Sequence, residues 1–226
     1  MNSYVREINE FSYLETKCII KKNNRIGLLG GTFNPIHCGH ISMAHIALYE
    51  FSLGEVVFMP LGNPPHKRDA FVASSSERLD MIRLATEHEA RFSVSTIETE
   101  RSGYTYTVDT LEMLARIRKD TDFYYIIGAD TLFELKTWKN AERVMLLTDF
   151  ICILRPGQDD TKVRQYAQTL NLEYGHKIHI AQERGPDVSS SEIRLLAAEC
   201  VFPAGWVPEK VAQYIRQHNV YGERFE

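Results

Sequence analysis

The sequence predicts an α/β fold: an open parallel sheet with helices on both faces and a small helical cap at the C-terminal end. Two observations predict it. Short apolar or β-branched runs alternate with helical patterns along most of the 226 residues, as expected of repeated βαβ units. The first apolar run, Arg25–Leu29, leads directly into paired glycines and two histidines, which suits the carboxyl edge of such a sheet, where ligands bind.

Six strands are predicted, each from a short apolar or β-branched run bounded by polar residues or glycine. Helical patterns separate them, so neighbouring strands are expected to be parallel. In chain order the strands are Arg25–Leu29, Glu55–Met59, Phe92–Ser95, Phe123–Ile127, Phe150–Leu154 and Lys177–Ile180.

Seven helices are predicted between and after the strands. Two of them start with the S-x-x-E spacing of a capping box, at Ser74–Glu77 and Ser189–Glu192, in which the serine side chain accepts from the first free amides. In chain order the helices are Ile41–Phe51, Ser76–Glu89, Thr107–Lys119, Thr131–Leu135, Thr161–Leu172, Ser190–Ala198 and Glu209–His218.

The chain is divided into three parts. Residues 1–24 precede the first strand, and their role is not evident from the sequence. Residues 25–186 form the core, with no repeat, low-complexity segment or linker inside it. Residues 187–226 form a helical C-terminal part, because the pattern changes after Arg184-Gly185-Pro186 to two helices separated by turn residues.

Composition indicates an ordinary globular protein. Hydrophobic residues make up 44% of the chain, and the net charge is −4, so a nucleic-acid partner is not expected. No apolar run approaches the ~20 residues of a membrane span, so no membrane partner is expected either. The four cysteines follow no metal or disulfide spacing and the N-terminus resembles no targeting peptide, which favours the cytoplasm. The sequence does not decide the oligomeric state, so a monomer and a homo-oligomer both remain open.

The most informative motif is Gly30-Gly31-Thr32-Phe33-Asn34-Pro35-Ile36-His37-Cys38-Gly39-His40. Glycines let the backbone approach a ligand closely, and amides at the start of a helix bind anions. We interpret the motif as a phosphate site. A zinc pair formed by His37 and His40 is less favoured, because zincin histidines are four residues apart with a glutamate between them. The histidines could also be ordinary polar residues at a helix start.

Two further motifs carry hydrogen-bond donors. Asn63-Pro64-Pro65-His66-Lys67 follows the second strand, where Lys67 could bind phosphate or be a solvated turn lysine. Val188-Ser189-Ser190-Ser191-Glu192-Ile193-Arg194 begins a helix, so Ser189 could cap it while Ser190 and Arg194 donate to phosphate oxygens.

Together these motifs resemble the Rossmann-like adenylyltransferase superfamily with its HxGH signature, and in particular bacterial nicotinate-nucleotide adenylyltransferases. The resemblance covers about residues 25–222. It also rests on elements that occur in the family's order: Gly62–Lys67, Glu77–Met81, Gly103–Thr110, Ile127–Asp130 and Trp138. Two residues depart from the family pattern. Asn34 stands where aspartate is usual, and Ser191 where threonine is usual.

The resemblance implies transfer of AMP from ATP to nicotinate mononucleotide, giving nicotinate adenine dinucleotide and pyrophosphate in NAD biosynthesis, with Mg²⁺ bound to ATP and no dedicated metal site in the protein. It implies that His40 donates to the α-phosphate and His37 to the ATP phosphates, with Lys67 and Arg194 on the triphosphate. The other ATP-binding residues implied are Gly30, Gly31, Thr32, Phe33, Gly39, Gly128, Asp130, Ser189 and Ser190. Those implied for the mononucleotide are Asn34, Tyr104, Thr105 and Trp138.

Two alternatives remain open at the sequence level. One is an adenylyltransferase that prefers nicotinamide mononucleotide, or another acceptor such as phosphopantetheine. The acid and the amide differ by a group that backbone amides would contact, which leaves no side-chain signature. The other is a nucleotide-sensing module that has lost turnover, which Asn34 keeps open.

Overall fold

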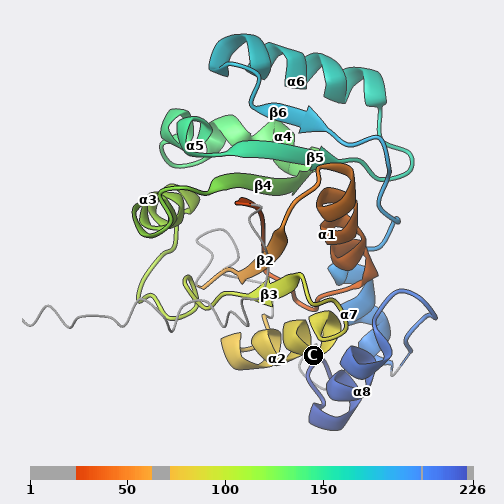
Figure 1. Cartoon of the computed structure of the whole chain (residues 1–226). Helices are drawn as coiled ribbons and strands as arrows, with labels where there is room; N and C mark the ends of the chain where they lie inside the picture. The colour runs from red at the N-terminus through yellow and green to blue at the C-terminus, as the bar shows by residue number, and fades with distance from the viewer. Residues whose placement is uncertain (1–23, 63–71, 200, 223–226) are drawn as a thin grey trace, which may run out of the picture.

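The computed structural model describes residues 24–62, 72–199 and 201–222. Its centre is a parallel sheet of six strands in the order β3-β2-β1-β4-β5-β6. Helices cover both faces (Figure 1), as the sequence predicted. All six predicted strands are confirmed, with ends that shift by one or two residues. They are β1 Arg25–Gly31, β2 Glu55–Pro60, β3 Phe92–Val94, β4 Asp122–Gly128, β5 Asp149–Ile153 and β6 Ile178–Ile180.

All seven predicted helices are present, and one unpredicted helix, α5, lies between β4 and β5. The fourth predicted helix is α4, continued by the 3-10 turn η1 at Leu135–Thr137. The helices are α1 Cys38–Glu50, α2 Ser75–Thr86, α3 Thr107–Ile117, α4 Ala129–Glu134, α5 Ala141–Leu147, α6 Asp160–Tyr174, α7 Ser190–Ala198 and α8 Glu209–His218.

Two hydrophobic cores lie on opposite faces of the sheet, because successive side chains of a strand point to opposite faces. Leu29 and Phe58 belong to the core that α1, α2, α7 and α8 cover. Leu28 and Val57, their neighbours in sequence, belong to the core under α3, α4, α5 and α6. Helix α8 packs on α2, so the C-terminal helices extend the first of these two layers (Figure 1).

The strand order fixes where a ligand can bind. Strand β1 pairs with β2 on one side and with β4 on the other, all parallel. Strands are therefore added on one side of β1 up to β3 and on its other side from β4 onward, so the direction of the strand order reverses between β1 and β4. Ligands of doubly wound sheets bind at the carboxyl ends of the strands around such a switch point. In this protein those ends are Gly31 of β1 and Gly128 of β4.

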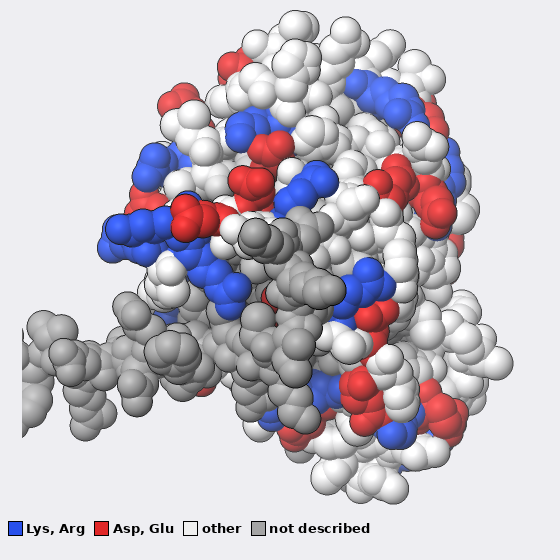
Figure 2. All heavy atoms as spheres, in the orientation of Figure 1, with Lys and Arg blue, Asp and Glu red and all other residues white. Residues whose placement is uncertain are grey.

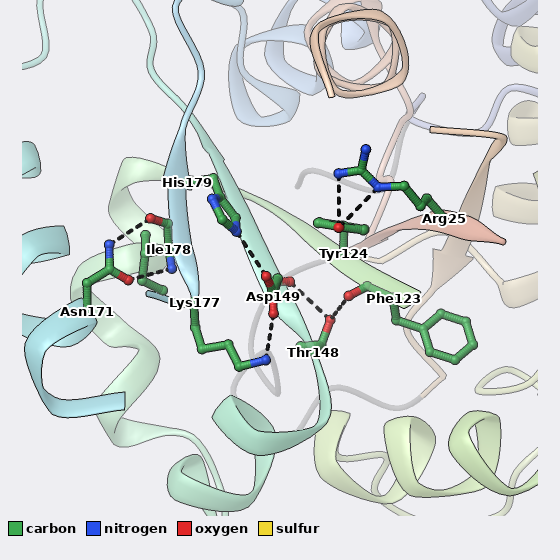
Figure 3. A network of polar contacts seen from close by, with 9 residues as sticks. All are labelled: Arg25, Phe123, Tyr124, Thr148, Asp149, Asn171, Lys177, Ile178 and His179. Carbon is green, nitrogen blue, oxygen red and sulfur yellow. Dashed lines mark hydrogen bonds and ion pairs between the residues drawn. The ribbon is translucent and has the colours of Figure 1, made fainter. Parts of the chain in front are cut away.

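A polar network lies at the opposite, amino end of the sheet (Figure 3). Asp149, the first residue of β5, accepts from Lys177 Nζ at 2.7 Å, and its other oxygen lies 2.9 Å from His179 Nε2. Nearby, the Arg25 guanidinium binds the Tyr124 hydroxyl. These contacts join the starts of β1, β4, β5 and β6, so the network stabilises the sheet away from its ligand edge.

Charged side chains of both signs are interspersed over the face shown in Figure 2. Any positive potential at the ligand edge must therefore come from a few local groups rather than from a basic surface. Within residues 24–62, 72–199 and 201–222, no helix has the length and apolar character needed to cross a membrane.

Candidate active site

The phosphate loop, residues 30–37, starts at the carboxyl end of β1. Glycine is required at its first position, because a Cβ on Gly30 would lie 2.0 Å from the Tyr125 hydroxyl. Phe33 has a φ of 49°, and its ring is buried in the core under α1. A left-handed residue in such a loop turns successive amides toward one side, the arrangement that binds anions. The loop therefore has the backbone form that the sequence predicted for a phosphate site.

Helix α1 begins at Cys38, three residues earlier than predicted, with His37 as its N-cap residue. His40 therefore lies in the first turn rather than before the helix. The His37 and His40 rings lie against each other, tilted by 31° with centroids 3.7 Å apart, and the Phe33 ring packs edge-on against His40 at 4.9 Å. Both histidines are thus held at the helix end that carries positive partial charge.

His37 is buried and uncharged at neutral pH. Burial, helped by the positive charge of Arg155, lowers its pKa to about 4. Its Nδ1 is buried with no hydrogen-bond partner among the described residues. A buried polar atom without a partner is unusual in a native protein and suggests that a ligand completes the site. Gly39 leaves room beside it, since a Cβ there would lie 2.8 Å from His37 Nδ1.

The tautomer of His40 follows from one contact. The backbone N–H of His37 donates to His40 Nδ1 at 3.3 Å. Because Nδ1 accepts a hydrogen bond, the proton of the neutral ring is on Nε2. His40 therefore presents an N–H donor on the side away from the backbone.

Helix α7 contacts the phosphate loop directly. Arg194 Nη1 donates to the Asn34 carbonyl at 2.8 Å, and Ser190 Oγ donates to the Pro35 carbonyl at 3.0 Å. Ser189 caps the helix: its Oγ accepts from the Glu192 amide and donates to the Glu192 carboxylate. The structure thus places Ser190 and Arg194 on carbonyls of the loop and gives Ser189 a capping role, and their donation to phosphate oxygens stays a prediction.

The Asn34 side chain is buried under the loop. Its Oδ1 accepts from the Ala73 amide at 3.0 Å and from the Tyr221 hydroxyl at 2.9 Å. The sequence placed Asn34 among mononucleotide-binding residues, and that role stays a prediction. The contacts show a different use of the side chain, because its oxygen connects three distant segments of the chain.

The other residues predicted to bind the mononucleotide lie beyond β3 and β4. Tyr104 is 42% exposed and Thr105 is buried, and Thr105 Oγ1 has no hydrogen-bond partner among the described residues. Trp138 is half-buried and packs edge-on against Tyr125 at 5.7 Å. Trp138 therefore closes the edge of the core under α3 and α5, with part of its surface exposed.

At the end of β4, Gly128 is the N-cap residue of α4, and nothing lies within 4 Å of where its Cβ would be. Asp130 follows it and forms a salt bridge with Arg155, which comes just after β5. The predicted Lys67 and its neighbours from Asn63 lie outside the described residues.

Three comparisons bear on this arrangement. The profile of the cytidylyltransferase-like family matches residues 28–196. A probable nicotinate-nucleotide adenylyltransferase of Thermoanaerobacter is 36% identical over 89% of this chain and 96% of its own length. The chain belongs to the cytidylyltransferase-like family, in its nicotinate-nucleotide adenylyltransferase branch. This membership confirms the resemblance that the motifs indicated.

Other adenylyltransferases of this branch agree. A probable nicotinate-nucleotide adenylyltransferase of Moorella thermoacetica is 35% identical over 92% of this chain and 96% of its own length. The nicotinic acid mononucleotide adenylyltransferase of Plasmodium falciparum, solved with NaAD, is similar with a TM-score of 0.68 over 87% of this chain and 97% of that one. That structure is 19% identical, so it supports the Rossmann-like fold alone.

Sequence reasoning assigned no role to several residues near this site, and two of them are Arg155 and Glu98. Arg155 follows the predicted strand Phe150–Leu154, and its position after a strand end is the signal that could have identified it. Glu98 is buried, with its backbone carbonyl close to Gly62 just after β2, and its Oε1 accepts from the Thr110 hydroxyl at 2.8 Å. Burial raises the pKa of Glu98, against the opposing effect of that hydrogen bond. The segment Thr96–Glu100 gave no sequence signal for a buried carboxyl.

Proposed function

We propose that this chain transfers AMP from ATP to nicotinate mononucleotide, forming nicotinate adenine dinucleotide and pyrophosphate. The observation that carries the proposal is the meeting of His37, His40 and Arg194 at the end of β1, in a chain 36% identical to a probable enzyme of this name. Each of these groups donates hydrogen bonds or positive charge, which is what a reaction between two anions requires.

The reaction needs little covalent chemistry from the protein. The attacking group is a phosphate monoester with a second pKa near ~6, so at neutral pH it is already ionised and needs no general base. His37, with its pKa lowered to about 4, is neutral there. The protein's task is to align the two phosphates and to neutralise charge that builds on the α-phosphate and on the leaving pyrophosphate.

Each group has a role in that task. The Nε2–H of His40 donates to the α-phosphate, and the helix end that His37 caps favours the negative charge beside it. Arg194, in the first turns of α7, and Arg155, just after β5, add positive charge for the triphosphate. Thr105 and Trp138 hold the pyridine ring of the mononucleotide. Lys67 is proposed for the triphosphate on the strength of the motif alone.

Mg²⁺ is proposed to enter with ATP. No group of three His, Cys, Asp or Glu side chains within the described residues could hold a metal ion. We therefore propose that phosphate oxygens and water supply most of the ligands of the ion, as Mg²⁺ prefers. When bound, the ion would neutralise phosphate charge, and Asp130, in the first turn of α4, would orient its water ligands.

The test is pyrophosphate release from ATP with either nicotinate mononucleotide or its amide. A higher kcat/KM for the acid supports the proposal, and a preference for the amide overturns the choice of substrate. Saturable ATP binding without pyrophosphate release from either would instead identify a nucleotide-sensing module. The reaction without mononucleotide is the control for ATP hydrolysis.

The cytoplasm is proposed as the place of this reaction. Cys38 and Cys152 are both free thiols, which suits a reducing compartment. Mass spectrometry of the intact protein from cells, with free thiols alkylated at lysis, tests this: alkylated Cys38 is expected, and an oxidised Cys38 would contradict it.

A further inference from the structure

Arg78, in the first turns of α2, has a buried guanidinium, with the residue only 1% exposed. It donates to the Thr32 carbonyl of the phosphate loop at 2.9 Å and to the Ala73 carbonyl at 3.1 Å. Two further bonds, to the Ser75 hydroxyl at 3.1 Å and to the Gly62 carbonyl at 3.5 Å, complete the set. One side chain therefore connects the phosphate loop, the end of β2 and the start of α2.

The burial of this charge needs an explanation. Among the described residues no carboxylate forms a salt bridge with Arg78, and burial lowers the pKa of the guanidinium. A buried cation costs several kcal/mol unless its donors are satisfied. The carbonyls that accept from Arg78 offset part of this cost. An apolar side chain, however, would fill the same space without any such cost. A positive charge kept at this place is therefore better explained by a role toward an anion than by packing.

The contact with Thr32 has a geometric consequence. The Thr32–Phe33 peptide is trans, so its carbonyl and its N–H point in opposite directions from one rigid plane. Because Arg78 holds the Thr32 carbonyl on the side of α2, the N–H of Phe33 points to the other side. The left-handed φ of Phe33 is the conformation in which successive amides converge on an anion.

Two other carbonyls of the loop are held in the same way, by Arg194 on Asn34 and by Ser190 on Pro35. Arg194 and Ser190 come from α7, whereas Arg78 comes from α2. The loop carbonyls are thus turned toward protein donors from two helices. This leaves the ligand side of the loop to N–H groups, as an anion requires.

We propose that Arg78 is a positioning residue for the ATP phosphates: it fixes the Thr32–Phe33 peptide so that the Phe33 N–H faces the anion, and it adds a buried positive charge behind the loop. The inference rests on the proposed function in that it takes the bound anion to be a triphosphate.

The test compares Arg78→Met with Arg83→Met, a matched control on the partly exposed side of the same helix. ATP affinity is measured by calorimetry below the melting temperature of each variant. Arg78→Met is expected to weaken ATP binding at least tenfold and to raise the KM for ATP with little change in the KM for the mononucleotide. Arg83→Met is expected to bind as the wild type does. A folded Arg78→Met protein with ATP affinity within twofold of wild type overturns the inference.

A second measurement needs no variant, in case Arg78→Met does not fold. In the 26.0 kDa wild-type protein, the amide ¹⁵N–¹H signal of Phe33 is followed as tripolyphosphate or ATP is added. A large, saturable shift is expected from both. A Phe33 amide that does not respond at saturating ATP overturns the inference.

Tripolyphosphate also separates this inference from the proposed function. It binds without a mononucleotide, so loss of tripolyphosphate binding in Arg78→Met supports the inference even if the wild type releases no pyrophosphate. Conversely, a wild type that turns over and an Arg78→Met variant that binds normally would reject the inference alone.

Discussion

The backbone N–H of His37 donates to Nδ1 of His40, and the centroids of the two imidazole rings lie 3.7 Å apart at the start of α1. The hydrogen bond sets the tautomer of His40, and a proton on Nδ1 would break it. Two cations at this distance would also repel each other, so the pair is suited to act as uncharged donors toward a phosphate rather than as fixed positive charges.

His40→Ala is expected to lower kcat by roughly 10²–10³, the usual loss when one donor to a developing charge is removed. Initial rates of pyrophosphate release at saturating substrates measure it. His88→Ala, at an exposed histidine beyond the end of α2, is the control and should retain wild-type kcat. A wild-type kcat in His40→Ala would exclude His40 from the reaction.

The low pKa of His37 predicts that the free energy of unfolding depends on pH. Its pKa of about 4 in the folded protein lies below the ordinary value near 6.5. The unfolded chain therefore binds a proton that the folded chain does not, so stability is full above pH 6.5 and falls toward pH 4, by roughly 2–4 kcal/mol. His37→Asn keeps a residue suited to an N-cap and should reduce this loss of stability in acid. Urea unfolding at pH 4.5 and 7.5 measures the loss, and an equal loss in both proteins would refute the prediction.

Arg155→Met is expected to raise the KM for ATP about tenfold, because Arg155 adds positive charge beside His37 and binds Asp130 at the site. Its exposed salt bridge contributes little to stability, so the melting temperature should barely change. Arg164→Met also removes one positive charge, on the exposed side of α6, and is the control for the change in net charge. If the two variants have the same KM, Arg155 has no role in ATP binding.

Asp149→Asn is expected to destabilise the protein by about 1–2 kcal/mol, because Lys177 and His179 lose the carboxylate between them. The pKa of Asp149 is lowered in the folded protein by the hydrogen bonds of these two residues, against the opposing effect of burial. Its contribution is therefore present at neutral pH and lost in acid. The network lies at the amino end of the sheet, so kcat should stay unchanged. Asp122→Asn, at the exposed start of β4, is the control, and an equal loss of stability there would contradict the prediction.

Asn34→Asp, which restores the residue usual in the family, is expected to leave kcat within about threefold of wild type. Its side-chain oxygen accepts from the Ala73 amide and the Tyr221 hydroxyl, and a carboxylate can accept both bonds. Thermal unfolding should then become sensitive to acid, because the new carboxylate would be ionised at neutral pH. A large loss of kcat would show that the uncharged amide matters for the reaction.

The strands and most helices could be predicted because apolar runs and capping serines are local signals. The Ser74 and Ser189 caps are both formed. Helix α5 was not predicted: it follows η1 and Trp138 closely, and Asn140, its N-cap residue, has a left-handed φ of 54° that no pattern in the sequence indicates. Arg155 and Arg78 escaped it for another reason. Their roles depend on which strand and helix ends meet, and the strand order that decides this is a property of the whole sheet.

The hydrogen bond between Asn34 and Tyr221 joins residues that are 187 positions apart, and Arg194 reaches the same loop across 160 positions. The phosphate loop therefore receives these two supports only after residues 194 and 221 have been synthesised. A nascent chain can form β1 and α1 early, yet it would hold ATP poorly until residue 221 has left the ribosome.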